Sequence, residues 1–199
     1  MNNKLVYKNI NLTRVKVKNN ILKIWTQTSE SERFDWYESA HNFAKNNTSN
    51  EVELSKFIGV IAALSPLKSW NQNKSLAYDV YNGKKSGHMP VFIGKALNIL
   101  NSNGKDYTIL DILKGNKISS FYLNIRYFND FQHITIDRHA LSIALGHKIT
   151  DMEYAGMTTK QYNFFVQCYI YTAKSIGVNP LLLQSATWVK YRTLKKDKL

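Results

Sequence analysis

The chain has 199 residues, of which 44% are hydrophobic and 13% aromatic, enough to bury a core without disulfides or metals. This composition excludes a generally disordered chain, and the single cysteine, Cys168, excludes an internal disulfide, a CxxC redox pair and a multi-cysteine zinc or iron–sulfur site. No apolar run reaches the ~18 residues of a membrane span and no signal-peptide stretch is seen, so we expect a soluble, cytoplasmic protein.

The positive charge is concentrated at the two ends of the sequence. The chain carries 27 basic and 14 acidic residues, a formal net charge of +13. Residues 1–29 hold six basic residues and no acid, and residues 190–199 hold five basic residues against Asp197. Basic ends on a nearly neutral body favour a polyanionic partner, nucleic acid before an anionic membrane. The alternative is solubility in a composition rich in Lys and Asn, as an AT-rich genome would impose.

The predicted elements form an all-α protein with a single domain over residues 1–199. Its helical body is expected over residues 30–189, between a basic N-terminal segment (1–29) and a basic tail (190–199). Only residues 5–17 are ambiguous, with a pattern compatible with a short pair of strands. Helices are expected over about 31–44, 52–64, 70–81, 89–100, 108–115, 118–128, 138–146 and 162–177, and from 180 into the basic tail.

Capping residues mark the ends of two of these helices. Asn50, with Glu53 three residues on, has the spacing of a capping box, and Pro66 ends the helix that follows. Asp137 stands at the N-cap position of a later helix, and Gly146 follows the last apolar residue of that helix.

Several familiar catalytic motifs are missing from the sequence. It contains no phosphate-binding glycine loop, no GxSxG elbow and no HExxH pair. His133, His139 and His147 do not have the spacing of metal ligands on a helix, and no cysteine accompanies them. We therefore expect no metal site and no cofactor.

Two segments carry a resemblance to a known family. Residues 57–81 read FIGVIAALSPLKSWNQNKSLAYDVY, an apolar helix that ends in Leu-Ser, a short turn and a second helix. Residues 113–146 read LKGNKISSFYLNIRYFNDFQHITIDRHALSIALG, in which Ile136-Asp137-Arg138-His139-Ala140 opens a helix. Over residues 52–190 the chain resembles the helix-hairpin-helix DNA glycosylases of the endonuclease III and adenine glycosylase group. It also looks like small phage-encoded proteins of that superfamily.

The resemblance implies a two-lobed helical bundle that acts on double-stranded DNA as a monomer and flips a base out of the duplex. It also implies that Asp137 is the catalytic carboxylate, because cleavage of an N-glycosidic bond builds positive charge on the sugar, which a fixed anion stabilises. The alternative is that Asp137 is only an N-cap. Lys117 lies close to the position of the Schiff-base lysine of bifunctional relatives, and its alternative is a solvated surface lysine.

Further residues take their expected roles from the same resemblance. Those expected to contact DNA are Ser65, Pro66, Leu67 and Lys68 in the turn after the apolar helix, Gly115 and Asn116 in the hairpin, and Arg138 and His139 after the carboxylate. Those expected to line the base pocket are Trp36, Tyr37, Trp70, Asn71, Asn73, Tyr122 and Asn124. For the aromatic residues the alternative is core packing, and for Pro66 it is a simple helix stop. Gln184 and Trp188 are expected to pack the last helix onto the core.

The sequence also departs from the family pattern at two points. Residues 113–117 keep one of the two glycines of the family's hairpin, and the cysteine cluster of some relatives is absent, so no iron–sulfur cluster is implied. Three functions follow as hypotheses. The first is a DNA glycosylase, the second a phage DNA-modifying transferase that adds a group to an activated 5-substituted pyrimidine, and the third a non-catalytic DNA-binding protein.

Overall fold

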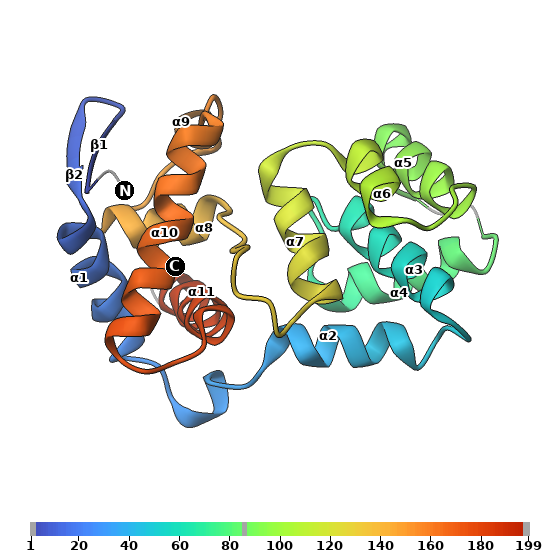
Figure 1. The fold of residues 1–199 in the computed structure, drawn as a ribbon, viewed down its shortest axis with the longest axis horizontal. Coiled ribbons are helices and arrows are strands. Elements are labelled where there is room, and N and C mark those ends of the chain that lie inside the picture. Colours follow the sequence, from blue (N-terminus) through green and yellow to red (C-terminus); the bar gives the residue numbers. More distant parts are fainter. Residues whose placement is uncertain (1–2, 85–86, 197–199) are drawn as a thin grey trace. The chain divides into compact units, whose positions relative to one another are not determined.

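Helices make up most of the chain, and the described strands form a single N-terminal hairpin (Figure 1). The computed structural model describes residues 3–84 and 87–196. The chain divides into two compact units, one formed by Met1–Tyr37 with Asn129–Leu199 and the other by Glu38–Phe128. We call them unit 1 and unit 2. Their boundary falls inside helix α2 (Trp36–Lys45).

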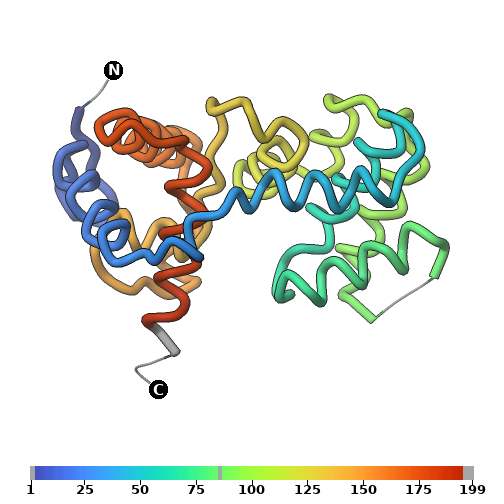
Figure 2. The backbone as a smooth tube through the Cα atoms, turned by 90° about the horizontal axis from the view of Figure 1, so that it is seen from below, coloured from blue at the N-terminus to red at the C-terminus, as the bar shows by residue number. Residues whose placement is uncertain are grey.

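Unit 1 brings the first and last parts of the sequence together. Its elements are β1 (Lys4–Tyr7), β2 (Ile10–Thr13), α1 (Arg14–Trp25), the short 3-10 helix η1 (Glu30–Glu32), α8 (Arg138–Leu145), α9 (Asp151–Tyr154), α10 (Thr159–Ser175) and α11 (Pro180–Lys196). Helix α1 packs against α8, α10 and α11, as the path of the chain in Figure 2 makes visible. Val17 and Ile21 are fully buried in this packing, so α1 is part of the core of unit 1.

The N-terminal hairpin is a tight antiparallel pair. Lys4 lies opposite Thr13 and Tyr7 opposite Ile10, which leaves Lys8 and Asn9 as a two-residue turn. Both turn residues have positive φ, 46° and 65°, the backbone that two-residue hairpin turns require. The pair of strands anticipated over residues 5–17 is therefore present, although it ends at Thr13.

Unit 2 is built around one helix that is buried along most of its length. Its elements after α2 are α3 (Glu51–Leu64), α4 (Trp70–Tyr81), α5 (Pro90–Leu100), α6 (Asp106–Leu113) and α7 (Asn116–Arg126). Helices α4, α5, α6 and α7 all pack against α3. Gly59 lets α5 and α6 approach closely, because a Cβ there would lie 2.9 Å from Ile99 Cγ2 and 3.0 Å from Ile109 Cγ2.

Most of the expected helices are confirmed, and their caps explain why. Asn50 accepts hydrogen bonds from the backbone N–H groups of Val52 and Glu53, as an N-cap does. The Glu53 carboxylate accepts from Ser49 N, one residue earlier than a capping box requires. Gly146 ends α8 in the left-handed conformation at φ 81°.

Three expectations about the first part of the chain need correction. The helix expected from residue 31 begins at Trp36, because Ser29 and Glu32 cap the separate short helix η1. The sequence pattern did not predict helix α1, because only Val17 and Ile21 are buried on it and basic residues interrupt its apolar positions. The basic N-terminal segment is thus folded into unit 1. The basic tail continues α11 to Lys196, and the expected contributions of Asp197 and Lys198 lie outside the described residues.

Candidate active site

Asp137 caps helix α8 and has a defined partner for each carboxylate oxygen. Its Oδ1 accepts a hydrogen bond of 2.7 Å from Ala140 N, and its Oδ2 accepts one of 2.8 Å from the indole Nε1 of Trp188 on α11. The residue is half-buried. The expected N-cap is therefore confirmed, and the side chain is held from two directions in one orientation.

The backbone on both sides of Asp137 is fixed by tyrosine hydroxyls. Residues 133–137 are neither helical nor paired with a strand. Tyr162 donates to Ile134 O and accepts from Ile136 N, both at 3.0 Å. Tyr154 donates to Ile136 O at 2.7 Å. Beyond the carboxylate, Tyr169 donates to Ala140 O at 3.0 Å. Side chains of α9 and α10 thus replace the ladder of hydrogen bonds that a sheet would supply.

Two of these tyrosines, Tyr154 and Tyr169, are held in their neutral form by a raised pKa. Burial, together with the neighbouring Tyr162 hydroxyl and the Asp137 carboxylate, raises the pKa of Tyr154. Burial first, and then the charge of Asp137, raises the pKa of Tyr169 well above its ordinary value. Among the side chains described, those of residues 3–84 and 87–194, no Lys or Arg forms an ion pair with Asp137. Its negative charge is held by neutral N–H groups and is not cancelled by a salt bridge.

Aromatic and cationic side chains surround the Trp188 indole, which contacts Asp137. The Arg192 guanidinium carbon lies 4.7 Å from the centroid of the Trp188 ring. The ring of His139 lies 5.9 Å from the Trp188 ring and 5.9 Å from the Tyr191 ring. Trp188 was expected only to pack α11 onto the core, so its bond to Asp137 was missed. The only sequence signal is the i, i+4 spacing that puts Gln184, Trp188 and Arg192 on one face of a helix.

Two of the residues expected in the base pocket lie in unit 1 as well. Tyr37 is buried, and its hydroxyl donates to Oε1 of Gln184, one helical turn before Trp188, at 2.8 Å. Trp36 is half-buried and meets the Tyr37 ring edge to face at 5.2 Å. The buried hydroxyl of Tyr37 is satisfied by Gln184, which makes Tyr37 a packing residue of this unit.

Arg138 follows the carboxylate but points to a different partner. Its Nε lies 3.2 Å from Oδ1 of Asp151 at the start of α9. Asp151 is 86% exposed, so this ion pair contributes little to stability, on the order of 0–1 kcal/mol. The expected contact of Arg138 and His139 with DNA phosphates stays a prediction.

In unit 2, the turn between α3 and α4 exposes a strained apolar residue. Ser65 caps α3 and donates to Ala62 O at 2.9 Å, and Lys68 N donates to Ser65 O. Between them, after Pro66, Leu67 has φ 62° and is 86% exposed. The left-handed conformation costs a residue with a Cβ roughly 1–2 kcal/mol, and exposure of a leucine gains nothing in return. Such a residue marks a functional position more often than a structural one.

A hollow in the surface lies directly after this turn. It is open, has a volume of about 460 Å³ and is lined by Lys68, Asn71, Gln72, Ser75, Leu76 and Asp79. Asn71 thus faces an accessible surface. Trp70, by contrast, meets the Phe43 ring of α2 at 6.2 Å and carries Lys74 over its own ring at 5.6 Å. Trp70, the first residue of α4, therefore packs against α2.

Three residues expected in the base pocket are buried in the interior of unit 2, which corrects that expectation. Asn73 is 2% exposed, and its Nδ2 donates to Ile61 O at 3.1 Å on the face of α4 that meets α3. Tyr122 and Asn124 are fully buried on α7. Polar and aromatic residue types looked suitable for a base, but the helical phase turns all three towards the core.

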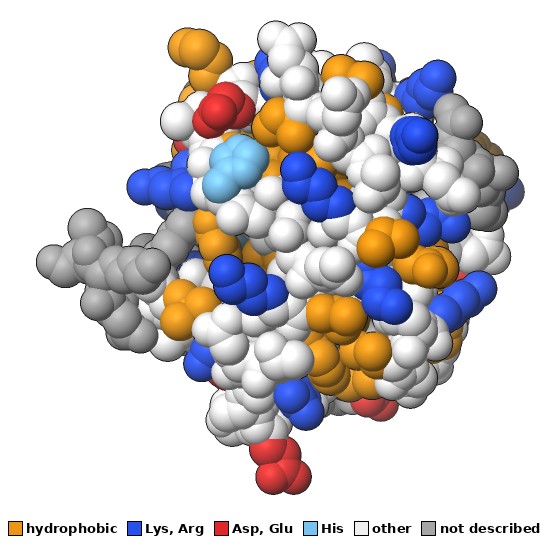
Figure 3. All heavy atoms as spheres, turned by 90° about the vertical axis from the view of Figure 1, so that its left-hand side faces the viewer, with side chains coloured by type: hydrophobic (Ala, Val, Ile, Leu, Met, Phe, Trp, Pro, Cys, Tyr) orange, Lys and Arg blue, Asp and Glu red, His pale blue; other side chains and the backbone are white. Residues whose placement is uncertain are grey.

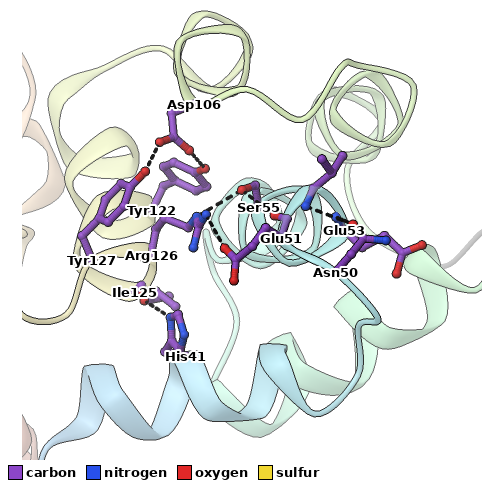
Figure 4. A network of polar contacts seen from close by, with 11 residues as sticks. His41, Asn50, Glu51, Glu53, Ser55, Asp106, Tyr122, Ile125, Arg126 and Tyr127 are labelled. Atoms are coloured by element: carbon purple, nitrogen blue, oxygen red, sulfur yellow. Dashed lines mark hydrogen bonds and ion pairs between the residues drawn. The ribbon is translucent and has the colours of Figure 1, made fainter.

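Tyr122 belongs to a network of polar contacts that joins α3, α6 and α7 (Figure 4). The hydroxyls of Tyr122 and Tyr127 both donate to the carboxylate of Asp106. Arg126 donates to Glu51 Oε2 at 2.8 Å and to Ser55 Oγ at 3.1 Å. Burial, and then the bond to Asp106, raises the pKa of Tyr122. Every charged group of this network has a partner, so we interpret the network as a structural hub, a cluster of polar contacts that joins three helices.

The predicted hairpin is a two-residue connection between α6 and α7. Lys114 has φ 51° and Gly115 has φ 88°, and α7 begins at once with Asn116 and Lys117. Space around Gly115 is open, so only its backbone conformation calls for glycine. No side chain caps the start of α7. Lys117 is half-exposed on the first turn of α7 in unit 2, whereas Asp137 belongs to unit 1.

Two further features are absent from the described residues, a metal-binding cluster and a membrane-spanning helix. Among them there is no group of three or more His, Cys, Asp or Glu residues that could hold a metal ion. None of the helices in residues 3–84 and 87–196 is long and apolar enough to cross a membrane.

Comparison with known proteins adds one family. Neither the curated proteins nor the solved structures contain a match to the chain. A family model, described as a family of unknown function (DUF7178), matches residues 3–195. That match covers both units and nearly the whole sequence, including Asp137, Trp188 and the turn at Leu67, so the chain belongs to the DUF7178 family.

Proposed function

We propose that the chain is a DNA base-processing enzyme of the helix-hairpin-helix glycosylase type, which flips a modified or damaged base and cleaves its N-glycosidic bond. The observation that carries the proposal is the state of Asp137. Its carboxylate is half-buried, oriented by two neutral N–H donors and paired with no described cation. A fixed, uncancelled negative charge is what a reaction through a positively charged sugar requires.

The chemistry uses this carboxylate in two ways. As the bond between C1′ and the base nitrogen breaks, its electron pair leaves with the base and positive charge develops on C1′ and the ring oxygen. Asp137 stabilises that charge. Water then adds to C1′, and its proton passes to a free lone pair of Asp137 and from there to solvent or to the departing base. The Trp188 N–H occupies one lone pair of Oδ2 and leaves the other open.

The features of unit 2 support contact with DNA. Leu67 combines an exposed apolar side chain with a backbone held at φ 62°, as expected of a wedge that enters a base stack. Helix α7 follows the two-residue connection at Lys114 and Gly115, and its N-cap residue Gly115 has no side chain to cap it. The N-terminus of a helix favours a phosphate through its dipole and its backbone N–H groups.

The test is base release from duplexes that carry uracil or oxidised, alkylated or hydroxymethylated pyrimidines, with alkali treatment to reveal abasic sites. Asp137→Asn is the informative variant, because Asn caps a helix as well as Asp does but carries no charge. Asp151→Asn is the matched control, since it removes one exposed carboxylate of unit 1. We expect release with the wild type and the control and loss of release with Asp137→Asn.

Two outcomes contradict the proposal. One is the absence of abasic sites with every duplex, and the other is equal activity of Asp137→Asn and the wild type. Mass spectrometry of nucleosides after incubation with hydroxymethylated DNA and amines distinguishes group transfer from base release. Borohydride trapping tests Lys117, and a trapped adduct that Lys117→Gln abolishes would add strand cleavage to the activity.

A further inference from the structure

The hairpin and helix α1 of unit 1 present a set of cations and contain no acidic residue, although the Glu153 carboxylate of α9 interacts electrostatically with Lys8. The set comprises Lys4, Lys8, Arg14, Lys16, Lys18 and Lys23. Within the described part of the chain none of the six forms an ion pair, although four other basic residues do. The first turn of α1 contains no acidic residue either. Seen from this side, the surface carries many Lys and Arg side chains and few Asp or Glu side chains (Figure 3).

Two of these cations share one aromatic ring. The guanidinium carbon of Arg14 lies 5.3 Å from the centroid of the Tyr171 ring on α10, and Nζ of Lys18 lies 5.6 Å from the same centroid. Arg14 and Lys18 are one helical turn apart on α1, so the ring holds both charged groups on one side of the helix. Attraction to the ring offsets part of their mutual repulsion, and a bound anion would remove the rest.

Arg14 also has a donor that lacks an acceptor. Its Nε is buried and forms no hydrogen bond with any residue of the described ranges. A buried N–H without a partner costs roughly 1–3 kcal/mol, which Arg14 would recover by turning its guanidinium outward to an acceptor supplied by a ligand. Guanidinium N–H groups match the oxygens of a phosphate particularly well. Three independent features, the shared ring, the missing acids and the unpaired donor, therefore coincide at Arg14.

We propose that Arg14, Lys18 and Tyr171 form a site for the phosphates of a DNA backbone. Arg14 and Lys18 are four residues apart, so α1 rises by roughly 6 Å between them. That length of duplex carries about two phosphates on one strand. Lys16 and Lys23 are exposed on the other side of α1, and Lys4 and Lys8 are exposed on the hairpin. Two cations at this spacing fit the repeated anion of a backbone, and the remaining lysines add to its long-range attraction.

The site rests on the proposed function only in taking DNA as the partner. Among the described residues, no hydrogen bond, ion pair or ring contact joins Arg14, Lys18 or Tyr171 to Asp137 or Trp188. The site serves backbone binding that is independent of sequence and of base release, so each proposal can fail without the other. Binding of an undamaged duplex measures backbone binding alone, because no base is released from it.

The experiment measures the affinity of the full chain for a short fluorescein-labelled duplex without lesions, by anisotropy over a series of salt concentrations. The test variant is R14Q/K18Q. The matched control is K45Q/K84Q, which removes the same charge from exposed lysines of unit 2. We expect R14Q/K18Q to reduce the slope of log K against log salt by about 2, since each lost phosphate contact removes about 0.9. The control should keep the slope of the wild type.

A second pair of variants tests the ring without changing the charge, and serves if R14Q/K18Q does not fold. Tyr171→Phe keeps the aromatic face and should bind the duplex as the wild type does. Tyr171→Leu loses the face that holds the two cations together and should bind about two- to fivefold more weakly, the equivalent of the 0.5–1 kcal/mol of an exposed cation–π contact.

Three outcomes overturn the proposal. The first is a salt slope for R14Q/K18Q equal to that of K45Q/K84Q, which would reduce the effect to net charge. The second is equal affinity of Tyr171→Leu and Tyr171→Phe. The third is loss of binding to phosphatidylglycerol vesicles in R14Q/K18Q while its affinity for the duplex stays that of the wild type, which would assign the surface to a membrane.

Discussion

Two carboxylates at helix starts, Asp137 in unit 1 and Asp106 in unit 2, have opposite surroundings. Asp137 precedes α8 and accepts hydrogen bonds from a backbone N–H and an indole N–H. Asp106 opens α6 and accepts from the hydroxyls of Tyr122 and Tyr127. Tyrosines are close to both, but around Asp137 their hydroxyls bind the backbone and around Asp106 they bind the carboxylate itself.

The difference separates a site from a hub. At Asp106 both phenols converge on the carboxylate, and the neighbouring Arg126 is paired with Glu51, so the polar groups are consumed by one another. Around Asp137 the tyrosine hydroxyls bind the backbone, and the carboxylate itself is oriented by two N–H donors. An acidic residue at a helix start is therefore not informative by type. Each oxygen of both carboxylates accepts one hydrogen bond, so the two residues differ in their donors: two phenols at Asp106, and a backbone N–H and an indole N–H at Asp137.

The largest expected effect is on catalysis and separates the two residues most clearly. Asp137→Asn should lower the rate of base release by about 10²–10³-fold, the usual loss when a charge-stabilising group is removed. It should lower the unfolding free energy by about 1–2 kcal/mol, because Asn still caps the helix but turns an amide N–H towards the indole N–H of Trp188. Single-turnover kinetics and urea unfolding measure the two quantities. Asp106→Asn is the comparison, and its rate should stay within about threefold of the wild type once folded. A similar rate loss in both variants would remove the distinction between site and hub.

The second effect is on stability, and here we expect the larger change at Asp106. Asp106→Ala leaves the fully buried hydroxyl of Tyr122 without its acceptor, so we expect it to lower the unfolding free energy by about 2 kcal/mol. Tyr127 is 40% exposed and can turn to water, so Tyr127→Phe should cost less than about 0.5 kcal/mol. Urea unfolding of both variants at neutral pH gives the comparison. Asp106→Ala as stable as the wild type would show that the network carries little energy.

The sequence predicts the framework of both units but not which polar residues reach the surface. Helix positions follow from apolar spacing and caps such as Asn50 and Asp137, because these are local signals. Asn73, Tyr122 and Asn124 look like pocket residues by type, yet a shift of one or two positions on a helix decides between core and solvent. Such a shift is decided by packing against α3, which the sequence of α4 or α7 alone does not contain.

The partner of Asp137 was out of reach for a similar reason. Trp188 lies 51 positions later in the chain, and only the packing of α11 against α8 brings its indole to the carboxylate. The strain at Leu67 was equally hidden, since Ser-Pro-Leu-Lys predicts a turn but not which residue takes positive φ. Helix α1 was missed because cations outnumber the buried residues Val17 and Ile21 on its surface. Contacts between distant segments decided each of these features.

The third prediction concerns the frame around Asp137. Tyr162→Phe removes the hydroxyl that bridges Ile134 O and Ile136 N, both buried, and should cost about 1–2 kcal/mol of unfolding free energy. Because the freed segment carries Asp137, the rate should fall by about tenfold as well, an effect that Asp106→Ala would not share. Base release and unfolding of the same preparation give both numbers. A loss of stability without any loss of rate would show that the frame is not needed to orient Asp137.

The smallest expected effect has the opposite sign. Leu67→Gly relieves the strain at φ 62°, worth roughly 1–2 kcal/mol, but adds about 0.5–1 kcal/mol of chain entropy, so the protein should become more stable by about 0.5–1 kcal/mol. The same change removes the exposed wedge, and the fluorescence rise of 2-aminopurine in a bound duplex should disappear. Leu67→Ala separates the two causes, because it keeps the strained backbone and loses the wedge: its stability should match that of the wild type while its fluorescence response matches that of Leu67→Gly. A full fluorescence response from Leu67→Ala would show that the leucine side chain does not open the duplex and that the strained turn acts through its backbone.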